Sequence, residues 1–348
     1  MTNRWKLFLL GIFSALVLAA CNSTEIGDSN EPASTGANEK DPLVIVWYPN
    51  ESGAEMGPSR DAFGELLKEA TGRDVEHKLT TDYAIAIETI ANGNGHIAFM
   101  GAQGYIEAKN KNENIIPLVV PSGASGTLED ARYFSWLAVP KEKAEVYKDN
   151  GEFSLNATAG KSISFVSASS TSGFKVPTSS IIAHFSDKNL TQEQLMEGNE
   201  VYPTVLFGDS HQGSAVNMLM GRSDVAAFCD TCVSSYVELI EGEANKPGSI
   251  YKVRDDAAAP FNTLKGKEFT LIQVTPVLNA PFAANKDVLT QEEIDQIVQA
   301  MTSDETANNT DIFKPKELEE PALFTKSEEE RFVQVEDAWF NPIRELSK

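Results

Sequence analysis

The sequence predicts an α/β protein of two lobes with a ligand cleft between them. Short apolar runs alternate with amphipathic helical stretches, and this alternation occurs in two blocks along the 348 residues. A βαβ order within each block predicts a mostly parallel sheet with helices on its faces. Apolar strands expected at 133–139 and 269–275 would cross between the blocks. Open α/β sheets bind ligands at the carboxyl ends of their strands, which places a ligand between the lobes.

The first block follows from local signals of strand and helix. Strands are expected at 43–47, 75–79, 96–100 and 115–120. Helices are expected at 58–72, at 82–91 and from Gly101 onward. Glycines at 72 and 93 are typical of helix ends.

The second block repeats the pattern. Strands are expected at 162–166, 202–207 and 224–228, a turn at 169–173, and helices at 177–185 and 210–220. The acidic C-terminal part is expected to be helical, with 291–301 and 327–339 as its clearer helices. The predicted division is therefore lobe 1 at 42–136 and 270–348, and lobe 2 at 137–269.

Charge excludes some functions. The chain has 51 Asp and Glu residues against 29 Lys and Arg, a formal charge of −22. Sequence-independent binding of DNA or RNA needs a basic face, and an anionic bilayer attracts basic surfaces, so both partners are disfavoured. The apolar share of 41% is ordinary for a folded globular protein.

The N-terminus has the pattern of an export signal. Arg4 and Lys6 precede an apolar run at 7–20 that is too short to span a bilayer comfortably. The sequence Leu-Ala-Ala before Cys21 resembles a bacterial lipobox. This predicts a signal peptide at 1–20, lipidation of Cys21, a polar tether at 21–41, and a lipid-anchored protein on the outer face of the cytoplasmic membrane. The alternative is an ordinary signal peptide with an incidental cysteine.

Two further cysteines, Cys229 and Cys232, are spaced Cys-x-x-Cys. They are too few for a disulfide scaffold or a four-ligand zinc site. A local disulfide, buried thiols, thiol redox chemistry and metal binding all remain open from this spacing.

The most informative segment is the Ser/Thr loop, residues 169–177, between an expected strand and an expected helix. Small hydroxyl residues here leave backbone N–H groups accessible and add O–H donors. The unpaired amides of a helix N-terminus add partial positive charge, so such a loop can bind an oxyanion without a cationic side chain. A loop that merely caps its helix is the alternative interpretation.

Within this loop, Ser170-Thr171-Ser172-Gly173-Phe174 followed by Val176-Pro177 resembles the signature of phosphonate/phosphite/phosphate-type solute-binding proteins of ABC importers. Further segments agree with that family in order and spacing: 82–83, 96–101, 208–211, 222–227 and 276–286. The resemblance runs from about residue 43 to 300. It implies a type II periplasmic-binding-protein fold with a ligand cleft between two lobes.

The resemblance also implies site residues. The oxyanion would be held by amides and hydroxyls of Ser170, Thr171 and Ser172. Tyr83 would donate its phenol from the other lobe, His211 would donate a hydrogen bond, and Asp230 would be an acidic ligand residue. The structural alternatives are a half-buried aromatic residue for Tyr83, a core histidine for His211, and a solvated or helix-capping carboxylate for Asp230.

Two other segments follow strands that would face the cleft. Tyr48 or Ser52 would touch the ligand, with loop packing as the alternative. Gly101 and Ala102, at a helix start, would supply a second set of amides. An anion held between two helix N-termini, one per lobe, would couple binding to closure of the lobes.

The chain departs from the family pattern in two places. Met100 stands where the family often has a ligand tyrosine. Asn279 and Ala280 occupy the region where members that bind an aminophosphonate carry a second carboxylate. An ammonium-bearing ligand would therefore lack a counter-ion, which favours phosphite, methylphosphonate or a phosphate-like anion.

These observations predict an extracytoplasmic solute-binding component of an ABC importer. It would be a monomer that captures a small phosphorus oxyanion by closure of two lobes and delivers it to membrane permease subunits. Asp230 would select a protonated phosphorus oxyacid over sulfate. No catalysis, cofactor or metal is predicted, because no nucleophile–base pair, nucleotide loop or metal-ligand cluster is recognisable. The alternatives are a ligand-sensing receptor lipoprotein of the same fold and a thiol oxidoreductase using Cys229 and Cys232.

Overall fold

The structure, a computed structural model, describes residues 41–318 and 320–346. The predicted signal peptide, Cys21 and the tether up to residue 40 lie outside the described residues. Among the described helices, none combines the length and the apolar character that a membrane span requires.

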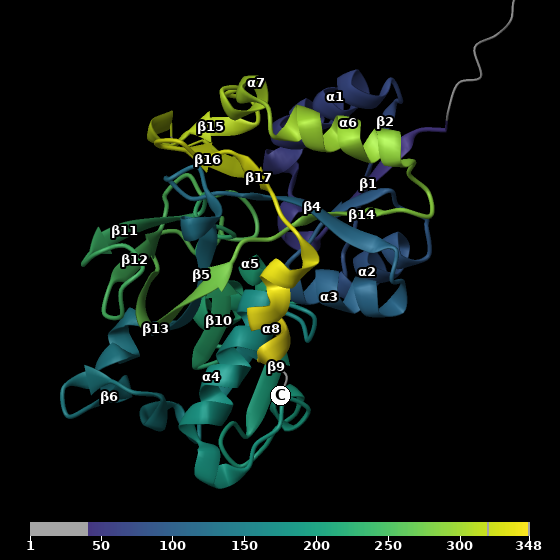
Figure 1. The fold of residues 1–348 in the computed structure, drawn as a ribbon. Coiled ribbons are helices and arrows are strands. Elements are labelled where there is room, and N and C mark those ends of the chain that lie inside the picture. The colour runs from purple at the N-terminus through teal and green to yellow at the C-terminus, as the bar shows by residue number, and fades with distance from the viewer. Residues whose placement is uncertain (1–40, 319, 347–348) are drawn as a thin grey trace, which may run out of the picture. The chain divides into compact units, whose positions relative to one another are not determined.

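Two mixed β-sheets form the framework (Figure 1). One has six strands in the order β17-β4-β14-β3-β1-β2, and the other has seven in the order β11-β12-β13-β5-β10-β8-β9. The strands of the six-stranded sheet are β1 (Leu43–Trp47), β2 (Val75–Leu79), β3 (Ile97–Phe99), β4 (Ile115–Pro121), β14 (Phe282–Asn285) and β17 (Phe332–Gln334). Those of the seven-stranded sheet are β5 (Arg132–Pro140), β8 (Ser162–Phe165), β9 (Thr204–Phe207), β10 (Val225–Cys229), β11 (Val237–Glu241), β12 (Ile250–Val253) and β13 (Glu268–Leu278). Two small sheets pair β6 (Lys148–Asp149) with β7 (Glu152–Phe153) and β15 (Phe313–Pro315) with β16 (Phe324–Lys326).

The chain passes from the six-stranded sheet to the seven-stranded sheet between β4 and β5, and returns between β13 and β14. The two strands expected to cross between the blocks, β5 and β13, are long antiparallel neighbours at the centre of the seven-stranded sheet. The two connections between the sheets therefore lie side by side, at the end of the β5–β13 pair where Arg132 pairs with Leu278.

The expectation of mostly parallel sheets is wrong. β1 pairs in parallel with β2 and β3, and β8 with β9 and β10, as the βαβ order predicts. The returning strand β14, however, lies antiparallel between β3 and β4, and β17 is antiparallel to β4. In the other sheet, β5 is antiparallel to both β10 and β13. The direction of a strand that pairs with a distant segment cannot be predicted from the local sequence.

Eight α-helices cover these sheets in the described part of the chain. They are α1 (Gly57–Thr71), α2 (Tyr83–Ala91), α3 (Ala102–Lys111), α4 (Val176–His184), α5 (His211–Leu219), α6 (Gln291–Met301), α7 (Asp304–Ala307) and α8 (Asn341–Glu345). Their ends follow sequence signals. Asp82 and Ser210 accept hydrogen bonds from first-turn amides of α2 and α5, and Thr290 forms a capping box with Glu293. Gly72 ends α1 in the left-handed conformation that glycine adopts without strain.

Strand periodicity distributes side chains between two faces of the six-stranded sheet. Leu43, Ile45 and Trp47 contribute to the core that includes residues of α1 and α6, whereas Val46 belongs to the core that includes residues of α2 and α3. Figure 1 shows α1 and α6 side by side over one face of this sheet, with α2 and α3 over the other. Side chains pack on both faces of β1, so its carboxyl end is held rigidly.

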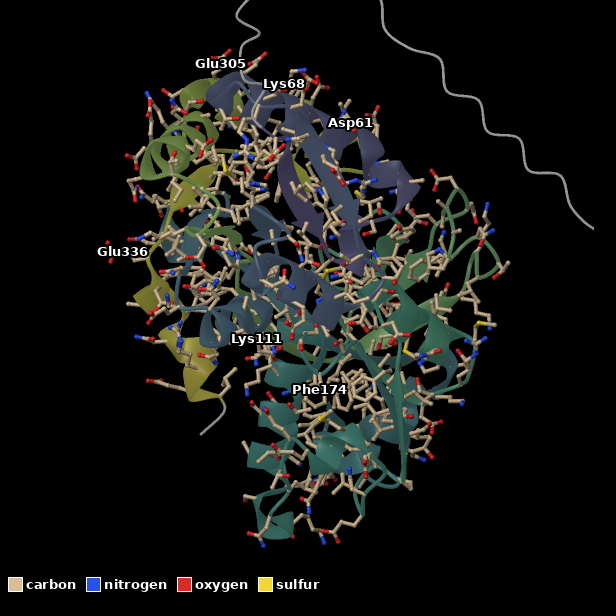
Figure 2. The ribbon with its side chains drawn as sticks, turned by 90° about the vertical axis from the view of Figure 1, so that its right-hand side faces the viewer. Asp61, Lys68, Lys111, Phe174, Glu305 and Glu336 are labelled. Atoms are coloured by element: carbon tan, nitrogen blue, oxygen red, sulfur yellow. A yellow bond between two sulfur atoms is a disulfide. The ribbon has the colours of Figure 1, made fainter. Side chains whose placement is uncertain are left out.

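The seven-stranded sheet is also covered on both faces. Alternate residues of β10 face different cores, with Phe228 in one and Ala227 in the other. Phe174 packs against Phe165 and Phe207, with ring centroids 5.2 and 5.9 Å away. Figure 2 shows Phe174 among closely packed side chains, whereas Glu305 and Glu336 lie at the outer edge. The Ser/Thr loop is thereby anchored by its own phenylalanine.

The expected helix at 327–339 is wrong. This segment contains β17 and a 3-10 helix, Asp337–Phe340, that leads into α8. Phe332 is buried in the aromatic core beside Phe282 and Phe313, and it pairs with Pro121 of β4. Burial against this sheet edge overrides the weak helical preference of an acidic segment.

Candidate ligand-binding site

One cavity of about 370 Å³ is lined by elements of both large sheets and by the β15–β16 segment. Its polar lining includes Tyr48, Asn50, Glu51, Tyr83, Tyr133, Ser170, Thr171, His211 and Asp230. Apolar residues line the same cavity: Met56, Phe99, Phe313, Leu323 and Phe324. Every buried polar residue in this lining lacks a full positive charge, and Arg132 and Lys316 are exposed. The buried hydrogen-bond donors that the cavity offers to a ligand are therefore uncharged.

The Ser/Thr loop contributes Ser170 and Thr171 to the cavity. A π-helical turn at Thr171–Lys175 follows β8 in place of the expected simple turn and continues into α4. Ser170 caps this turn, because its hydroxyl accepts a hydrogen bond from the Gly173 amide at 3.0 Å. Thr171 Oγ1 accepts a hydrogen bond from the Gln103 amide at 2.9 Å, which connects the loop to the first turn of α3. The loop is thus held in place from both sheets.

His211 is buried at the N-terminus of α5 and is fixed as one tautomer. Its Nδ1 accepts a hydrogen bond from the Cys229 amide at 3.0 Å, so the ring proton of the neutral form is on Nε2. Nε2 lies 3.4 Å from the Ser170 hydroxyl. Burial lowers the pKa of His211 to about 3, so the imidazole is neutral at ordinary pH. His211 consequently presents one N–H donor at the Ser/Thr loop.

Tyr48 and Tyr83 also line the cavity, with ring centroids 4.2 Å apart and ring planes tilted by 43°. The Tyr83 hydroxyl accepts a hydrogen bond from Asn50 Nδ2 at 2.7 Å, which leaves its own proton available to donate. The Tyr48 hydroxyl is buried and has no hydrogen-bond partner among the described residues. Burial raises the pKa of both phenols well above the usual value, so both remain protonated donors.

Asp230 lies in the short loop that the Cys229–Cys232 disulfide closes. Its Oδ1 accepts a hydrogen bond from the Phe134 amide at 2.9 Å, and its Oδ2 accepts one from Asn245 Nδ2 at 3.4 Å. Burial raises the pKa of Asp230 to about 6, and these hydrogen bonds oppose that rise. No ion pair holds Asp230 among the described residues, so its carboxylate can accept a hydrogen bond from a ligand.

Other residues predicted for the site are placed differently. Gly101 lines the cavity, and a Cβ at this position would come within 2.8 Å of Thr171 Oγ1. Ala102 and Ser172 are buried but do not line the cavity. The Ser172 carbonyl accepts a hydrogen bond from the Ser135 hydroxyl at 2.6 Å, while its own hydroxyl has no partner in the described structure. The Ser52 hydroxyl donates to the backbone carbonyls of Tyr48 and Thr80, and Ser52 does not line the cavity.

The sequence interpretation missed Asn50, Glu51 and Tyr133. Asn50 connects three elements: besides its bond to Tyr83, its Oδ1 accepts a hydrogen bond from the His211 amide at 3.1 Å, and its carbonyl accepts one from Gln212 Nε2. The available signal was position, because Asn50 and Glu51 come directly after the buried strand β1. Tyr133 begins a strand that was interpreted only as a crossing.

The two departures from the family pattern also lie at the cavity. Met100, Asn279 and Ala280 belong to its lining. Asn279 uses its side-chain amide to donate a hydrogen bond to the Pro121 carbonyl at 2.6 Å. Glu51 does supply a second carboxyl group to the lining, from a position outside this region.

Cys229 and Cys232 form a disulfide. Their sulfurs lie within 4.8 Å of a ring nitrogen of His211, but both belong to the disulfide and Nδ1 already accepts the Cys229 amide. Cys229 is fully buried. The disulfide thus fixes the loop that carries Asp230 and the amide that orients His211.

Comparison with known proteins identifies the class. Residues 45–340 match the family model of the ABC transporter, phosphonate, periplasmic substrate-binding protein. This match covers most of the chain, so the chain belongs to the phosphonate-binding family of periplasmic substrate-binding proteins of ABC transporters.

Individual proteins are also similar to this chain. The Phosphate-import protein PhnD of Mycolicibacterium smegmatis is 25% identical over 280 residues, covering 80% of this chain and 81% of the relative. A binding protein component of an ABC phosphonate transporter from Pseudomonas aeruginosa has a TM-score of 0.62 at 18% identity, covering 88% of this chain and 86% of its own. PhnD1 from Prochlorococcus marinus, solved in complex with methylphosphonate, has the same TM-score at 13% identity, covering 88% and 97%. The expected two-lobed α/β binding-protein fold is confirmed.

Proposed function

We propose that this protein captures a small phosphorus oxyanion, such as phosphonate, phosphite or phosphate, and delivers it to the permease subunits of an ABC importer. The two lobes, divided near residues 136 and 270, would close around the ligand. The protein would act by binding alone, without catalysis. A receptor that reports ligand binding to a membrane partner remains a second role for the same fold.

The observation that carries this proposal is the convergence of neutral donors on one cavity. Ser170 and Thr171 come from the Ser/Thr loop, His211 presents Nε2–H, and Tyr83 comes from the first turn of α2. A buried anion is costly unless hydrogen bonds surround it, and preorganised neutral donors can replace its hydration shell. The family assignment and the methylphosphonate complex of the Prochlorococcus marinus protein agree with this chemistry.

A ligand screen tests the proposal. Phosphite, methylphosphonate, phosphate and sulfate are added to the purified protein, and its unfolding is followed by thermal shift and by calorimetric titration. A ligand at 100 times its dissociation constant stabilises the fold by about 2.7 kcal/mol. At least one phosphorus oxyanion should produce such a shift, and a response to none of them would refute the proposed function.

Asp230 is proposed to provide discrimination against sulfate. An ionised carboxylate repels a fully ionised oxyanion, but it accepts a hydrogen bond from a P–OH group. In Asp230→Asn, the preference for phosphorus oxyanions over sulfate should fall about tenfold, which corresponds to about 1.4 kcal/mol. Calorimetric titration of both proteins with the same anions measures this ratio, and an unchanged ratio would remove this role of Asp230.

Attachment and assembly are further parts of the proposal. Cys21 would carry the lipid that holds a monomer on the outer face of the cytoplasmic membrane. Mass spectrometry of the mature protein should find a lipidated N-terminal Cys21, and Cys21→Ser should release the protein from the membrane fraction.

A further inference from the structure

Glu51 is a carboxyl group in the cavity for which the proposed function gives no task. It ends the 3-10 helix Pro49–Glu51 that follows β1, and it lines the cavity. Its Oε2 atom is buried without a hydrogen-bond partner in the described structure. Buried polar atoms nearly always have a partner, so this atom is a candidate for ligand contact.

The surroundings of Glu51 give it little compensation for a negative charge. The Arg60 guanidinium lies close enough to favour the ionised form, yet its Nη1 donates to the backbone carbonyls of Glu51 and Gly53. The other titratable groups around this part of the cavity are Tyr48, Glu55, Tyr83 of α2, Glu107 of α3, Tyr133 of β5, His211 of α5 and Asp230. All of these are neutral or acidic, and the cationic residues of the lining, Arg132 and Lys316, are exposed, so the buried part of the cavity disfavours a second carboxylate beside a bound anion.

Burial raises the pKa of Glu51 to about 8. Hydrogen bonds from its own backbone and from Asn50 oppose this rise. At neutral pH the group is therefore mostly a carboxylic acid with one O–H to donate. Asp230 differs, because its pKa of about 6 leaves it mostly ionised at neutral pH. Two carboxyl groups in one cavity thus have opposite hydrogen-bonding roles.

We propose that Glu51 determines specificity by donating a hydrogen bond, as a carboxylic acid, from Oε2 to an oxygen of the bound phosphorus oxyanion. This inference rests on the proposed function and makes it more specific. Glu51 donates to an ionised oxygen while Asp230 accepts from a P–OH group. The preferred ligand is then a singly protonated tetrahedral phosphorus oxyanion, which offers both kinds of oxygen.

The test compares Glu51→Gln and Glu51→Ala with the wild type. Calorimetric titration with methylphosphonate and phosphite is carried out from pH 6 to 9.5. The ratio of the variant's dissociation constant to the wild type's at each pH cancels the ionisation of the ligand itself. Glu55→Gln is the matched control, because Glu55 lies nearby, does not line the cavity, and accepts a hydrogen bond from Tyr236.

We expect Glu51→Gln to bind within about threefold of the wild type at pH 7, since its amide also donates a hydrogen bond. Glu51→Ala should bind at least about tenfold more weakly. Above pH 8 the wild type should lose affinity relative to Glu51→Gln by about tenfold per pH unit, as Glu51 ionises. The Glu55→Gln control should follow the wild type.

Three results would overturn the inference, and each differs from failure of the proposed function, in which the wild type binds no anion. Equal affinity of both Glu51 variants and the wild type would show that Glu51 does not contact the ligand. A second contrary result is that Glu51→Gln loses binding while the wild type prefers an aminoalkylphosphonate. Glu51 would then be a carboxylate partner of an ammonium group. If the variants do not fold, the carboxyl ¹³C shift of Glu51 in the ligand complex decides: an ionised Glu51 at pH 7 contradicts the proposal.

Discussion

At the scale of single residues, the hydrogen-bond donors of the site are buried neutral side chains, each oriented by a neighbouring group, rather than cationic side chains. The Cys229 amide selects the tautomer of His211, and Asn50 Nδ2 occupies an acceptor position on Tyr83. Each of these side chains is left with a hydrogen to donate. Since a neutral donor needs no counter-ion, the site can hold an anion without competing salt bridges.

The titration of His211 gives a prediction for stability. Its pKa is about 3 in the folded protein, against about 6.5 in an unfolded chain. The unfolded state therefore binds more protons between these values, and stability falls as pH decreases through this window. Between pH 7 and pH 5, the free energy of unfolding should fall by about 2 kcal/mol more in the wild type than in His211→Gln.

Denaturant unfolding of both proteins at each pH, without ligand, measures this difference. Other acidic groups change stability in both proteins alike, so only the difference between the two curves is informative. Parallel pH dependence of the two proteins would mean that His211 takes up a proton as readily in the folded protein as in the unfolded chain.

At the scale of elements, the Cys229–Cys232 loop joins the core of the seven-stranded sheet to the ligand site. Cys229 is the last residue of β10, and Asp230 and Thr231 line the cavity directly after it. Gln212 of α5 donates to the Cys232 carbonyl at 2.9 Å. The position of Asp230 therefore depends on the closed form of this loop.

Opening the disulfide should weaken both folding and binding. Loss of a native disulfide costs on the order of 2 kcal/mol of stability, and a freed loop no longer holds Asp230 and His211 in place. We expect reductant to lower the melting temperature and to raise the dissociation constant of the ligand identified in the screen. The double variant Cys229→Ser, Cys232→Ser should match the reduced protein and should not respond to reductant. Unchanged binding after confirmed reduction would contradict this prediction.

Elements were predictable from sequence where the signal is local. The caps Asp82, Ser210 and Thr290 mark helix starts in the structure, and the Ser/Thr loop was recognisable because its hydroxyl residues adjoin a helix. Asn50 and Glu51 were not recognised, since a polar residue after a strand is common. Two partners of Asn50, His211 and Gln212, lie more than 150 residues away in the sequence. The antiparallel position of β14 and the strand β17 likewise depend on contacts between distant segments.

At the scale of the whole molecule, the site must work against the protein's own charge. The chain carries a formal charge of −22, while the proposed ligand is an anion. Long-range repulsion slows the approach of an anion, whereas the short-range donors act only once it has entered the cavity. Affinity and association rate are therefore controlled by different parts of the molecule.

Salt should consequently speed ligand association. The screening length falls from about 30 Å at 0.01 M to about 10 Å at 0.1 M ionic strength, so repulsion from the surface weakens. Stopped-flow measurement with a phosphorus oxyanion should show an association rate constant that rises severalfold over this range. A rate that falls with salt would show that the exposed cationic residues of the cavity lining, Arg132 and Lys316, attract anions instead.

The place of β14 has a consequence for how the chain acquires its structure. Ala283 pairs with Ala98 on one side and Pro117 on the other, so the six-stranded sheet closes only across a very long stretch of intervening chain. The seven-stranded sheet, in contrast, is formed entirely within residues 132–278. Contacts between distant segments form slowly because they bear a larger loop-closure entropy. We therefore expect the seven-stranded sheet to form first. Its formation would bring together the two parts of the chain that make up the six-stranded sheet.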